Sequence, residues 1–195
     1  MKTEYIFKTE RLGFREWSEE DLNEFAKMNA DPEVMEYFLK PLTIPETEEF
    51  FERLQNHFKK HGYNYFATEI LETGEFIGFI GLARQEYESE FTPAVDIGWR
   101  LKKSAWGKGY ATEGARKCLE YAFRELNLDE VISTCTEKNA RSENVMKKIG
   151  MVKKGSFNHP KLKEHPDYEK FICYAITKDL WHQRTHLKTD CELLF

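Results

Sequence analysis

Two glycines one residue apart precede a strongly amphipathic helical segment, and this arrangement restricts the possible folds more than any other feature. The stretch is SAWGKGYATEGARKC, residues 104–118. The apolar residues at its end and beyond recur at intervals of three and four, as one face of a helix requires: Ala115, Cys118, Leu119, Ala122, Phe123 and Leu126. A helix start leaves about four backbone N–H groups without partners, at the positive end of the helix dipole. Because glycine leaves the backbone uncovered, the loop indicates either an anion site or a tight strand-to-helix turn.

Two known nucleotide motifs do not fit this loop. A P-loop requires GxxxxGK followed by Ser or Thr, whereas Lys108 is followed by Gly109. A dinucleotide fingerprint requires a third glycine three residues after Gly109, where the chain has Thr112. The sequence therefore argues against nucleoside triphosphate chemistry and against a Rossmann site.

Hydrophobic periodicity and turn residues predict an α/β chain in which strands surround a middle section of alternating strands and helices. Strands are expected over residues 5–16, 63–71, 75–84, 93–102, 130–136, 151–158 and 168–177. Helices are expected after the Ser18 and Thr43 capping boxes, at Asp31-Pro32, after the glycine loop and over residues 140–149. From Lys178 onward only a short helical turn and a weak tail are expected.

Nothing in the sequence marks a domain boundary, since it has no repeat, low-complexity segment or Gly/Ser linker. We therefore expect a single domain over residues 1–178, with residues 179–195 as a C-terminal tail packed on it or extending from it. The four cysteines form no CxxC pair and are expected to be reduced and buried. His182 and His186 have a metal-ligand spacing but no third ligand nearby, so no metal is predicted.

The charge balance limits the classes of partner. A net charge of −5 argues against a general nucleic-acid binder, because phosphate neutralisation needs a basic surface. The charge is uneven, with fourteen acids and nine bases in residues 1–60 but nine bases and four acids in residues 138–170, which could therefore face an anion. Apolar runs fall far short of the roughly 20 residues that span a bilayer, and the N-terminus lacks a secretory signal. We expect no membrane anchor and a cytoplasmic location.

Three phrases of the sequence together carry a family resemblance. Residues 95–123, VDIGWRLKKSAWGKGYATEGARKCLEYAF, are similar to a strand, a pyrophosphate loop of pattern Gln/Arg-x-x-Gly-x-Gly/Ala, and a helix. Residues 139–151, NARSENVMKKIGM, are similar to an Asn-led helix, and residues 9–17, TERLGFREW, to an opening strand. In this combination the chain resembles the GNAT acyl-CoA N-acetyltransferases, specifically the branch of the ribosomal-protein alanine N-acetyltransferases.

The resemblance implies a fold and a co-substrate. The fold is a mixed, mostly antiparallel central sheet with helices on both faces, splayed between the strand that ends near Leu101 and the strand 130–136. The co-substrate is acetyl-CoA, with its pantetheine arm in that gap. Trp106 stands at the Gln/Arg place of the loop pattern, so its contacts to pyrophosphate are expected from the main chain alone. The residues implied to bind acetyl-CoA are Trp99, Leu101, Trp106, Gly107, Lys108, Gly109, Tyr110, Ala111, Thr112, Asn139, Ser142 and Lys148.

The chemistry implied by the resemblance needs a base, because an alkylammonium with a pKa around 10 must lose a proton before it attacks. Asp96 is the candidate, since it interrupts an apolar strand beside the implied gap, where burial would raise its pKa. The alternative is an Asp96 that faces solvent or pairs with an arginine. Met146 stands where many relatives have a tyrosine acid, whereas Ser142 matches the serine of the ribosomal-protein branch. Capping or packing at the helix start is the structural alternative for Ser142.

The predicted activity is N-acetyl transfer from acetyl-CoA to a primary amine, either a protein N-terminus or a small amine, by direct attack in a ternary complex. Two alternatives stay open: a non-catalytic acyl-CoA-binding or regulatory module on the same fold, and a plain phosphate-binding α/β protein. The acceptor is not predicted, because acceptor contacts in this family come from variable loops, about residues 28–46, 85–92 and 156–168. The resemblance also makes a homodimer an open expectation.

Overall fold

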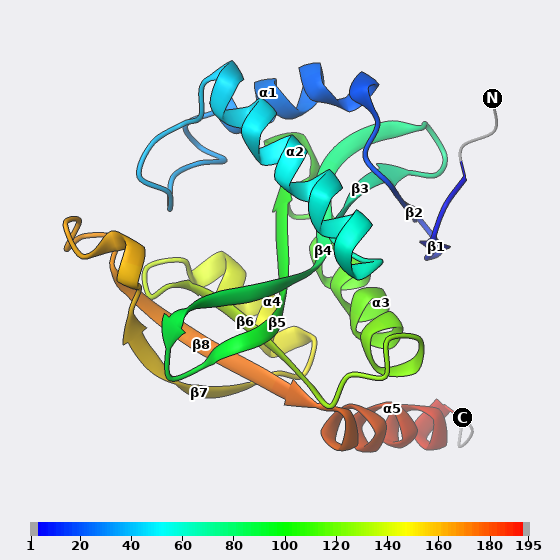
Figure 1. Cartoon of the computed structure of the whole chain (residues 1–195). Coiled ribbons are helices and arrows are strands. Elements are labelled where there is room, and N and C mark those ends of the chain that lie inside the picture. The colour runs from blue at the N-terminus through cyan, green and yellow to red at the C-terminus, as the bar shows by residue number, and fades with distance from the viewer. Residues whose placement is uncertain (1–3, 193–195) are drawn as a thin grey trace. The chain divides into compact units, whose positions relative to one another are not determined.

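The computed structural model describes the backbone of residues 4–192 and the side chains up to residue 185 (Figure 1). The chain divides into two compact units. Unit 1 comprises Met1–Arg84 and Ile97–Cys118, and unit 2 comprises Gln85–Asp96 and Leu119–Phe195. The expectation of a single domain over residues 1–178 stays a prediction.

Unit 1 contains the N-terminal strands and helices. Its elements are β1 (Phe7–Lys8), β2 (Leu12–Arg15), α1 (Leu22–Ala30), α2 (Ile44–His61) and β3 (Tyr65–Ile70). Short 3₁₀ turns precede α1 and the glycine loop, at Glu19–Asp21 and Lys103–Ala105. Three elements run from one unit into the other: β4 (Glu75–Ser89), β5 (Thr92–Leu101) and α3 (Tyr110–Arg124).

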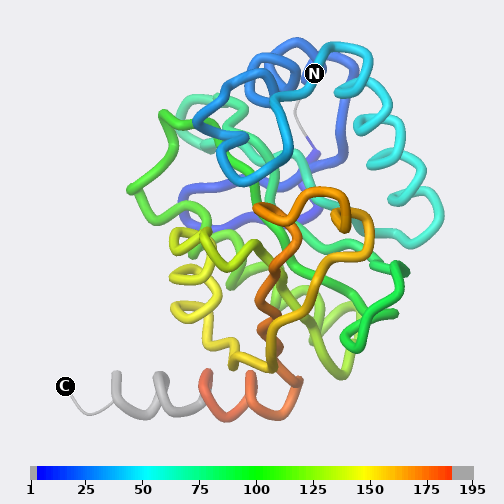
Figure 2. The backbone as a smooth tube through the Cα atoms, turned by 90° about the vertical axis from the view of Figure 1, so that its left-hand side faces the viewer, coloured from blue at the N-terminus to red at the C-terminus, as the bar shows by residue number. Residues whose placement is uncertain are grey.

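Unit 2 contains the remaining elements. These are β6 (Glu130–Thr136), α4 (Ala140–Lys148), β7 (Val152–Asn158), a 3₁₀ turn (Pro160–Leu162), β8 (Lys170–Thr177) and α5 (Lys178–Glu192). Figures 1 and 2 both show α5 continuing directly from the end of β8. The first turn of α5 is anchored within unit 2, because the buried Trp181 ring lies 5.5 Å from the Phe123 ring, centroid to centroid.

The strands form one eight-stranded sheet of order β1-β2-β3-β4-β5-β6-β8-β7. β1 pairs with β2, β2 with β3 and β3 with β4, and each of these pairings is antiparallel. The pairings of β6 with β8 and of β7 with β8 are also antiparallel. The pairing of β5 with β6 is parallel and contains the single Cα pair Asp96 with Ile132. The expected mixed, mostly antiparallel sheet that opens between these two strands is confirmed.

Helices cover both faces of the sheet in unit 1. Ala67 and Phe79 are register partners on β3 and β4, and they pack with Phe25 of α1 and Phe51 of α2 around Trp17. The opposite face carries α3, and a Cβ on Gly114 of α3 would lie 2.5 Å from Ile80 and 3.0 Å from Phe14. Glycine at position 114 is therefore required for α3 to approach the sheet this closely.

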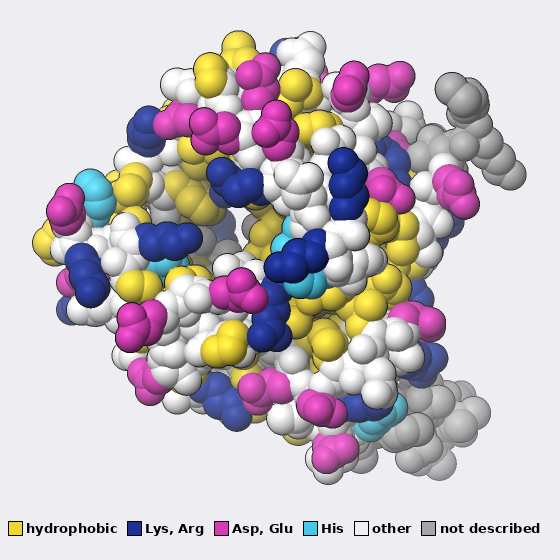
Figure 3. Space-filling model, viewed as in Figure 1, with side chains coloured by type: hydrophobic (Ala, Val, Ile, Leu, Met, Phe, Trp, Pro, Cys, Tyr) yellow, Lys and Arg dark blue, Asp and Glu magenta, His cyan; other side chains and the backbone are white. Residues whose placement is uncertain are grey.

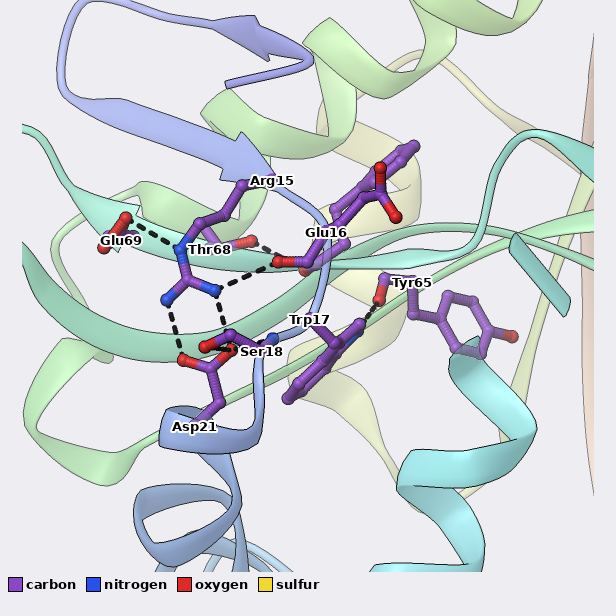
Figure 4. A network of polar contacts seen from close by, with 9 residues as sticks. Arg15, Glu16, Trp17, Ser18, Asp21, Tyr65, Thr68 and Glu69 are labelled. Carbon is purple, nitrogen blue, oxygen red and sulfur yellow. Dashed lines mark hydrogen bonds and ion pairs between the residues drawn. The ribbon is translucent and has the colours of Figure 1, made fainter. Parts of the chain in front are cut away.

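A buried ionic network fixes the start of α1 to the sheet in unit 1 (Figure 4). Arg15 of β2 donates from Nε to Glu69 of β3 at 2.9 Å, and from Nη1 and Nη2 to both carboxylate oxygens of Asp21 at 2.6 and 2.7 Å. The hydrogen bond with Asp21 raises the pKa of Arg15 above its usual value, although burial acts in the opposite direction. Asp21 also accepts from the backbone N–H of Ser18 at 2.9 Å, as the Ser18 capping box predicts.

The structure confirms α2 in detail. Thr43 and Glu46 bond to each other's backbone N–H groups, Pro45 lies in the first turn, and Gly62 ends the helix with φ of +76°. These signals lie within four residues of each helix end, which is why they could be recognised in the sequence.

Four expected elements differ from the structure. The strand 5–16 is two strands, because the backbone of Thr9 bonds to Leu12 and turns the chain between β1 and β2. Asp31-Pro32 opens a series of turns rather than a helix, and the Asp31 carboxylate accepts from the N–H of Glu33. Residues 85–89 continue β4 instead of forming a loop, and the short turn expected from Lys178 is the helix α5.

Candidate active site

The loop before α3, in unit 1, presents backbone N–H groups with no side chain over them. Gly107 and Gly109 have φ of +73° and +83°, in the region that favours glycine. The first hydrogen bond of α3 runs from the Glu113 N–H to the Gly109 carbonyl at 3.0 Å. The N–H groups of residues 107–112 make no hydrogen bond to any residue that the structure describes. They are therefore available to an anion at the positive end of the helix.

Arg11 and Thr9, between β1 and β2, hold this loop in place. Arg11 donates from Nη1 to the Lys108 carbonyl at 3.0 Å and from Nε to the Glu113 carboxylate at 2.7 Å, and its guanidinium lies over the Tyr110 ring. Thr9 donates to the other oxygen of Glu113 at 2.6 Å. Burial tends to raise the pKa of Glu113, but the hydrogen bonds from Thr9 and Arg11 lower it overall. Side chains from the turn between β1 and β2 thus hold the glycine loop and the first turn of α3 in position.

The loop fits the diphosphate of acetyl-CoA. Its amides without partners lie at a helix start, Lys108 is exposed beside them, and Thr112 adds a hydroxyl. The one acid in the first turn of α3 is Glu113, and its carboxylate is already engaged by Thr9 and Arg11. A Cβ at Gly107 would meet no atom of the described residues within 4 Å, so no side chain crowds that position.

Trp106 faces the interior of unit 1 rather than the loop. Its Nε1 donates to the Leu101 carbonyl at 2.8 Å, and its ring packs against the core cluster of α1 and α2. The Trp106 side chain is thereby committed to the fold, and contact between its main chain and pyrophosphate stays a prediction. The Leu101 carbonyl, expected to pair with pantetheine, already accepts this hydrogen bond.

Asp96 is buried in unit 2 at the single point where β5 pairs with β6. Its Oδ1 accepts from Gln85 Nε2 at 3.1 Å. Tyr87 lies near Asp96, and its pKa is raised to about 12, mainly by burial. A hydrogen bond with Thr134 acts to lower this pKa, and the charge of Asp96 acts to raise it. The solvent-facing alternative for Asp96 is therefore wrong, and its carboxylate is desolvated, as a base for this chemistry requires.

Asn139 and Ser142 stand at the start of α4 in unit 2. The Asn139 side chain caps the helix by accepting from the Ser142 N–H at 3.0 Å. The helix is tied to the sheet by Tyr174 of β8, whose hydroxyl donates to Glu143 at 2.7 Å. Capping is thus established for Asn139, while the Ser142 residue is half-buried in the first turn.

The remaining predicted residues of α4 separate into exposed and buried groups. Lys148 is exposed at the end of the helix, and its neighbour Lys147 pairs with Glu143 at 3.0 Å. Met146, at the position where many relatives are expected to have an acid, is buried in the core.

The described cysteines are buried and free. Burial raises the pKa of Cys118, and it raises those of Cys135 and Cys173 to about 12. These thiols stay protonated near neutral pH and are poor nucleophiles. Cys191 lies outside the residues whose side chains are described.

No group of three or more His, Cys, Asp or Glu side chains in the described part of the chain is arranged to hold a metal ion. His182 lies in α5, and the side chain of His186 lies outside the described residues. None of the described helices combines the length and the apolar character needed to cross a bilayer.

Arg11 and Arg100 are site candidates that the sequence does not single out. The phrase TERLGFREW resembles an opening strand, and nothing in it indicates that Arg11 reaches a carbonyl 97 residues later. Arg100 stands in the strand of the first family phrase, where no local signal identifies the partners of its side chain. Each arginine acquires its significance from partners distant in the sequence.

Comparisons with known proteins identify the family. A family model described as an acetyltransferase (GNAT) domain matches residues 11–152. The Bacillus subtilis (strain 168) protein named "Uncharacterized N-acetyltransferase YnaD" is 34% identical over 177 residues, which is 89% of this chain and 98% of that protein. An Aspergillus fumigatus protein named "FsC-acetyl coenzyme A-N(2)-transacetylase" is 33% identical over 163 residues, 80% of this chain and 68% of that protein.

A solved structure extends the likeness to the fold. The GNAT-family acetyltransferase from Bacillus anthracis superposes with a TM-score of 0.73 at 29% identity, over 88% of this chain and 98% of that one. The family model covers most of this chain. The alignment with the Bacillus subtilis relative covers 89% of this chain and nearly all of the relative. The chain therefore belongs to the GNAT family and is an acetyl-CoA-dependent N-acetyltransferase.

Proposed function

We propose that this enzyme transfers the acetyl group of acetyl-CoA to a primary amine, a protein N-terminus or a small amine, by direct attack in a ternary complex. The observation that carries the proposal is the row of unpartnered N–H groups at residues 107–112, in a loop held in place by Arg11. Such a loop binds a diphosphate at a helix start without needing a metal ion.

We assign roles in unit 1 as follows. The main chain of residues 106–112, with Lys108 and Thr112, holds the diphosphate. Main-chain groups of Trp99 and Leu101 hold the pantetheine arm, apart from the Leu101 carbonyl, which Trp106 already occupies. In unit 2, the family resemblance assigns Asn139, Ser142 and Lys148 to the same co-substrate.

Direct attack is supported by the state of the cysteines. A two-step mechanism through an acyl-cysteine requires an ionised thiol, but the three described thiols are buried with raised pKa values. In the proposed reaction the amine nitrogen forms a bond to the acetyl carbon, the carbon–sulfur bond breaks, and coenzyme A leaves as the thiol. Asp96 receives a proton from the neutral amine, and Ser142 passes a proton to the leaving sulfur and regains one from solvent, so that Ser142 ends the reaction as the neutral hydroxyl.

Exposed acids are gathered on unit 1 before α1, on the segment that joins α1 to α2 and at the start of α2, as Figure 3 shows at the top of the view. They include Glu19, Glu20, Glu36, Glu48 and Glu49, together with Glu33, which pairs with Lys103. The helix dipole stabilises the acids at the start of α2, and the whole group of acids attracts a cationic amine.

The cytoplasmic location, the absence of nucleic-acid partners and a homodimer stay predictions.

Initial-velocity kinetics test the proposal. Coenzyme A release and acetylated product are measured while acetyl-CoA and an amine are varied together, with acceptors drawn from peptides, polyamines and amino acids. A ternary complex gives intersecting double-reciprocal lines, whereas a covalent acyl-enzyme gives parallel lines. Parallel lines, or the absence of acetyl-CoA binding in calorimetry, would contradict the proposal.

A further inference from the structure

Arg100 of β5 carries a positive charge into unit 1 without a carboxylate partner in the described part of the chain. Among the described residues its guanidinium makes one hydrogen bond, from Nη1 to Asn29 Oδ1 at 2.7 Å, and no ion pair. Its Nε atom is buried and has no hydrogen-bond partner. Buried arginines are normally paired, because an unpaired buried charge costs several kcal/mol.

Aromatic rings surround the guanidinium. Cζ lies 4.2 Å from the centroid of the Phe38 ring and 5.5 Å from those of Phe50 and Phe79. These rings offset part of the cost of burying the charge. Burial nevertheless lowers the pKa of Arg100 to about 10, with Tyr65 acting in the opposite direction, and no carboxylate of unit 1 contributes.

One nitrogen of the guanidinium is accessible and without a partner. Asn29 occupies Nη1 and Nε is buried, whereas Nη2 has no partner among the described residues and, unlike Nε, is not fully buried. A guanidinium N–H donates a strong charge-assisted hydrogen bond to a carboxylate oxygen. The Arg100 residue is partly exposed, and Phe38, whose ring centroid lies 4.2 Å from Cζ, is 43% exposed, so a small ligand has access from solvent.

We propose that Arg100 binds the carboxylate of the acetyl acceptor, and that the acceptor is a small amine that also carries a carboxylate. This inference rests on the proposed function. The exposed acids before α1 and on the segment that joins α1 to α2 suit the ammonium group of such an acceptor, while Arg100 suits its carboxylate. Amines without a carboxylate leave the Arg100 donors unpaired and are therefore poorer substrates.

Matched pairs of acceptors test the inference. Each pair is an amino acid and its carboxamide, and kcat/KM is measured for both with wild type, Arg100→Gln and Arg53→Gln. Because the carboxamide also has a lower amine pKa, the acid-to-amide ratio of kcat/KM is compared between proteins, so that this intrinsic difference cancels. Arg53 is the control, because it is an exposed arginine on α2 whose guanidinium lies over the same Phe50 ring. Arg100→Gln should lower the acid-to-amide ratio by about 10-fold or more relative to wild type with an unchanged KM for acetyl-CoA, whereas Arg53→Gln should leave the ratio unchanged. The same ratio in Arg100→Gln as in wild type would overturn the inference and leave the proposed function intact.

A binding measurement separates failure of the inference from failure of the proposed function. Benzoate and benzamide, which have the same shape and differ in charge, are titrated by NMR or calorimetry without acetyl-CoA. Benzoate should bind wild type and Arg53→Gln, and should bind Arg100→Gln at least about 10-fold more weakly. Circular dichroism confirms that the variants are folded. Equal benzoate affinity for wild type and Arg100→Gln, or no benzoate binding at all, overturns the inference whether or not any amine is acetylated.

Discussion

Arg11 Nη1 donates a hydrogen bond of 3.0 Å to the backbone carbonyl of Lys108, a residue 97 positions later in the chain. The same guanidinium pairs with Glu113 in the first turn of α3. One exposed side chain therefore connects the turn between β1 and β2 with both the glycine loop and the helix that follows it. The conformation of the loop depends on this contact as well as on its glycines.

Replacing Arg11 should weaken acetyl-CoA binding. In Arg11→Ala the Lys108 carbonyl loses its donor, and Glu113 loses its cation and keeps only the hydrogen bonds from Thr9 and from the backbone of residue 11. The loop therefore becomes less ordered, and Glu113 adds a negative charge without a cation beside the diphosphate. We expect KM for acetyl-CoA to rise several-fold, corresponding to about 1 kcal/mol, since the pair is partly exposed. Arg53→Ala is the control for loss of an exposed arginine. An unchanged KM in a folded Arg11→Ala protein would refute this role.

Gly109→Glu should abolish measurable acetyl-CoA affinity while the protein stays folded. With φ of +83° at Gly109, any L side chain is strained by about 1–2 kcal/mol, and a carboxylate there repels the diphosphate. Gly74→Glu is the matched control, because Gly74 has φ of +69° and a Cβ added there would meet no atom within 4 Å. Calorimetric titration with acetyl-CoA measures both variants. Tight binding to Gly109→Glu would exclude the loop as the diphosphate site.

Asp96→Asn should lower kcat by about 100-fold or more if Asp96 is the base, because an amide cannot accept the proton of the amine. The Gln85 side chain can still bond to the new amide oxygen, so the fold should be preserved. The acidic limb of the pH–rate profile should also disappear in the variant. Glu88→Gln, an exposed acid on β4, is the control. A rate close to that of wild type would assign the base to another group.

Arg15→Met should destabilise the fold strongly. The substitution leaves Asp21 and Glu69, which are 4% and 5% exposed, as buried carboxylates without their cation. Removing one partner of a buried ionic network costs about 3–5 kcal/mol. Urea unfolding measures the difference, and Arg53→Met, at an exposed arginine, should change stability by less than about 0.5 kcal/mol. A stable Arg15→Met protein would show that the network contributes little.

Glu24 should make stability depend on acid pH. Hydrogen bonds from Lys102 and then Lys27 lower the pKa of Glu24 from 4.5 to about 2. Because folding lowers this pKa, ionised Glu24 stabilises the folded state at pH values above its unfolded pKa of 4.5. That stabilisation is lost as the pH falls from about 4.5 towards 2. The Tm difference between wild type and Glu24→Gln should therefore be positive at pH 6 and vanish near pH 2. The pair is exposed, so the difference should stay within about 1 kcal/mol. A difference that grows on acidification would contradict the assignment.

Local signals in the sequence were sufficient for much of the fold. The Thr43–Glu46 capping box and Gly62 located α2, and apolar spacing located the helix after the glycines, because these signals act over four residues or fewer. Asp31-Pro32 carries a local helix signal too, but there the Asp31 side chain forms a turn with Glu33 instead. A cap-like pair is therefore weak evidence for a helix where the same side chain can instead form a turn.

The sequence by itself determined that a glycine loop precedes an amphipathic helix, because glycine spacing and apolar periodicity are local properties, but it left that loop open as either an anion site or a tight turn. Only the tertiary structure decided that Arg11 fixes that loop, that Trp106 occupies the Leu101 carbonyl and that Arg100 lacks a carboxylate partner among the described residues. Arg100 and Asn29 are 71 residues apart, and whether a charge is paired depends on which strands and helices pack together. Burial and pairing are properties of the packed chain, so no short pattern of residues encodes them.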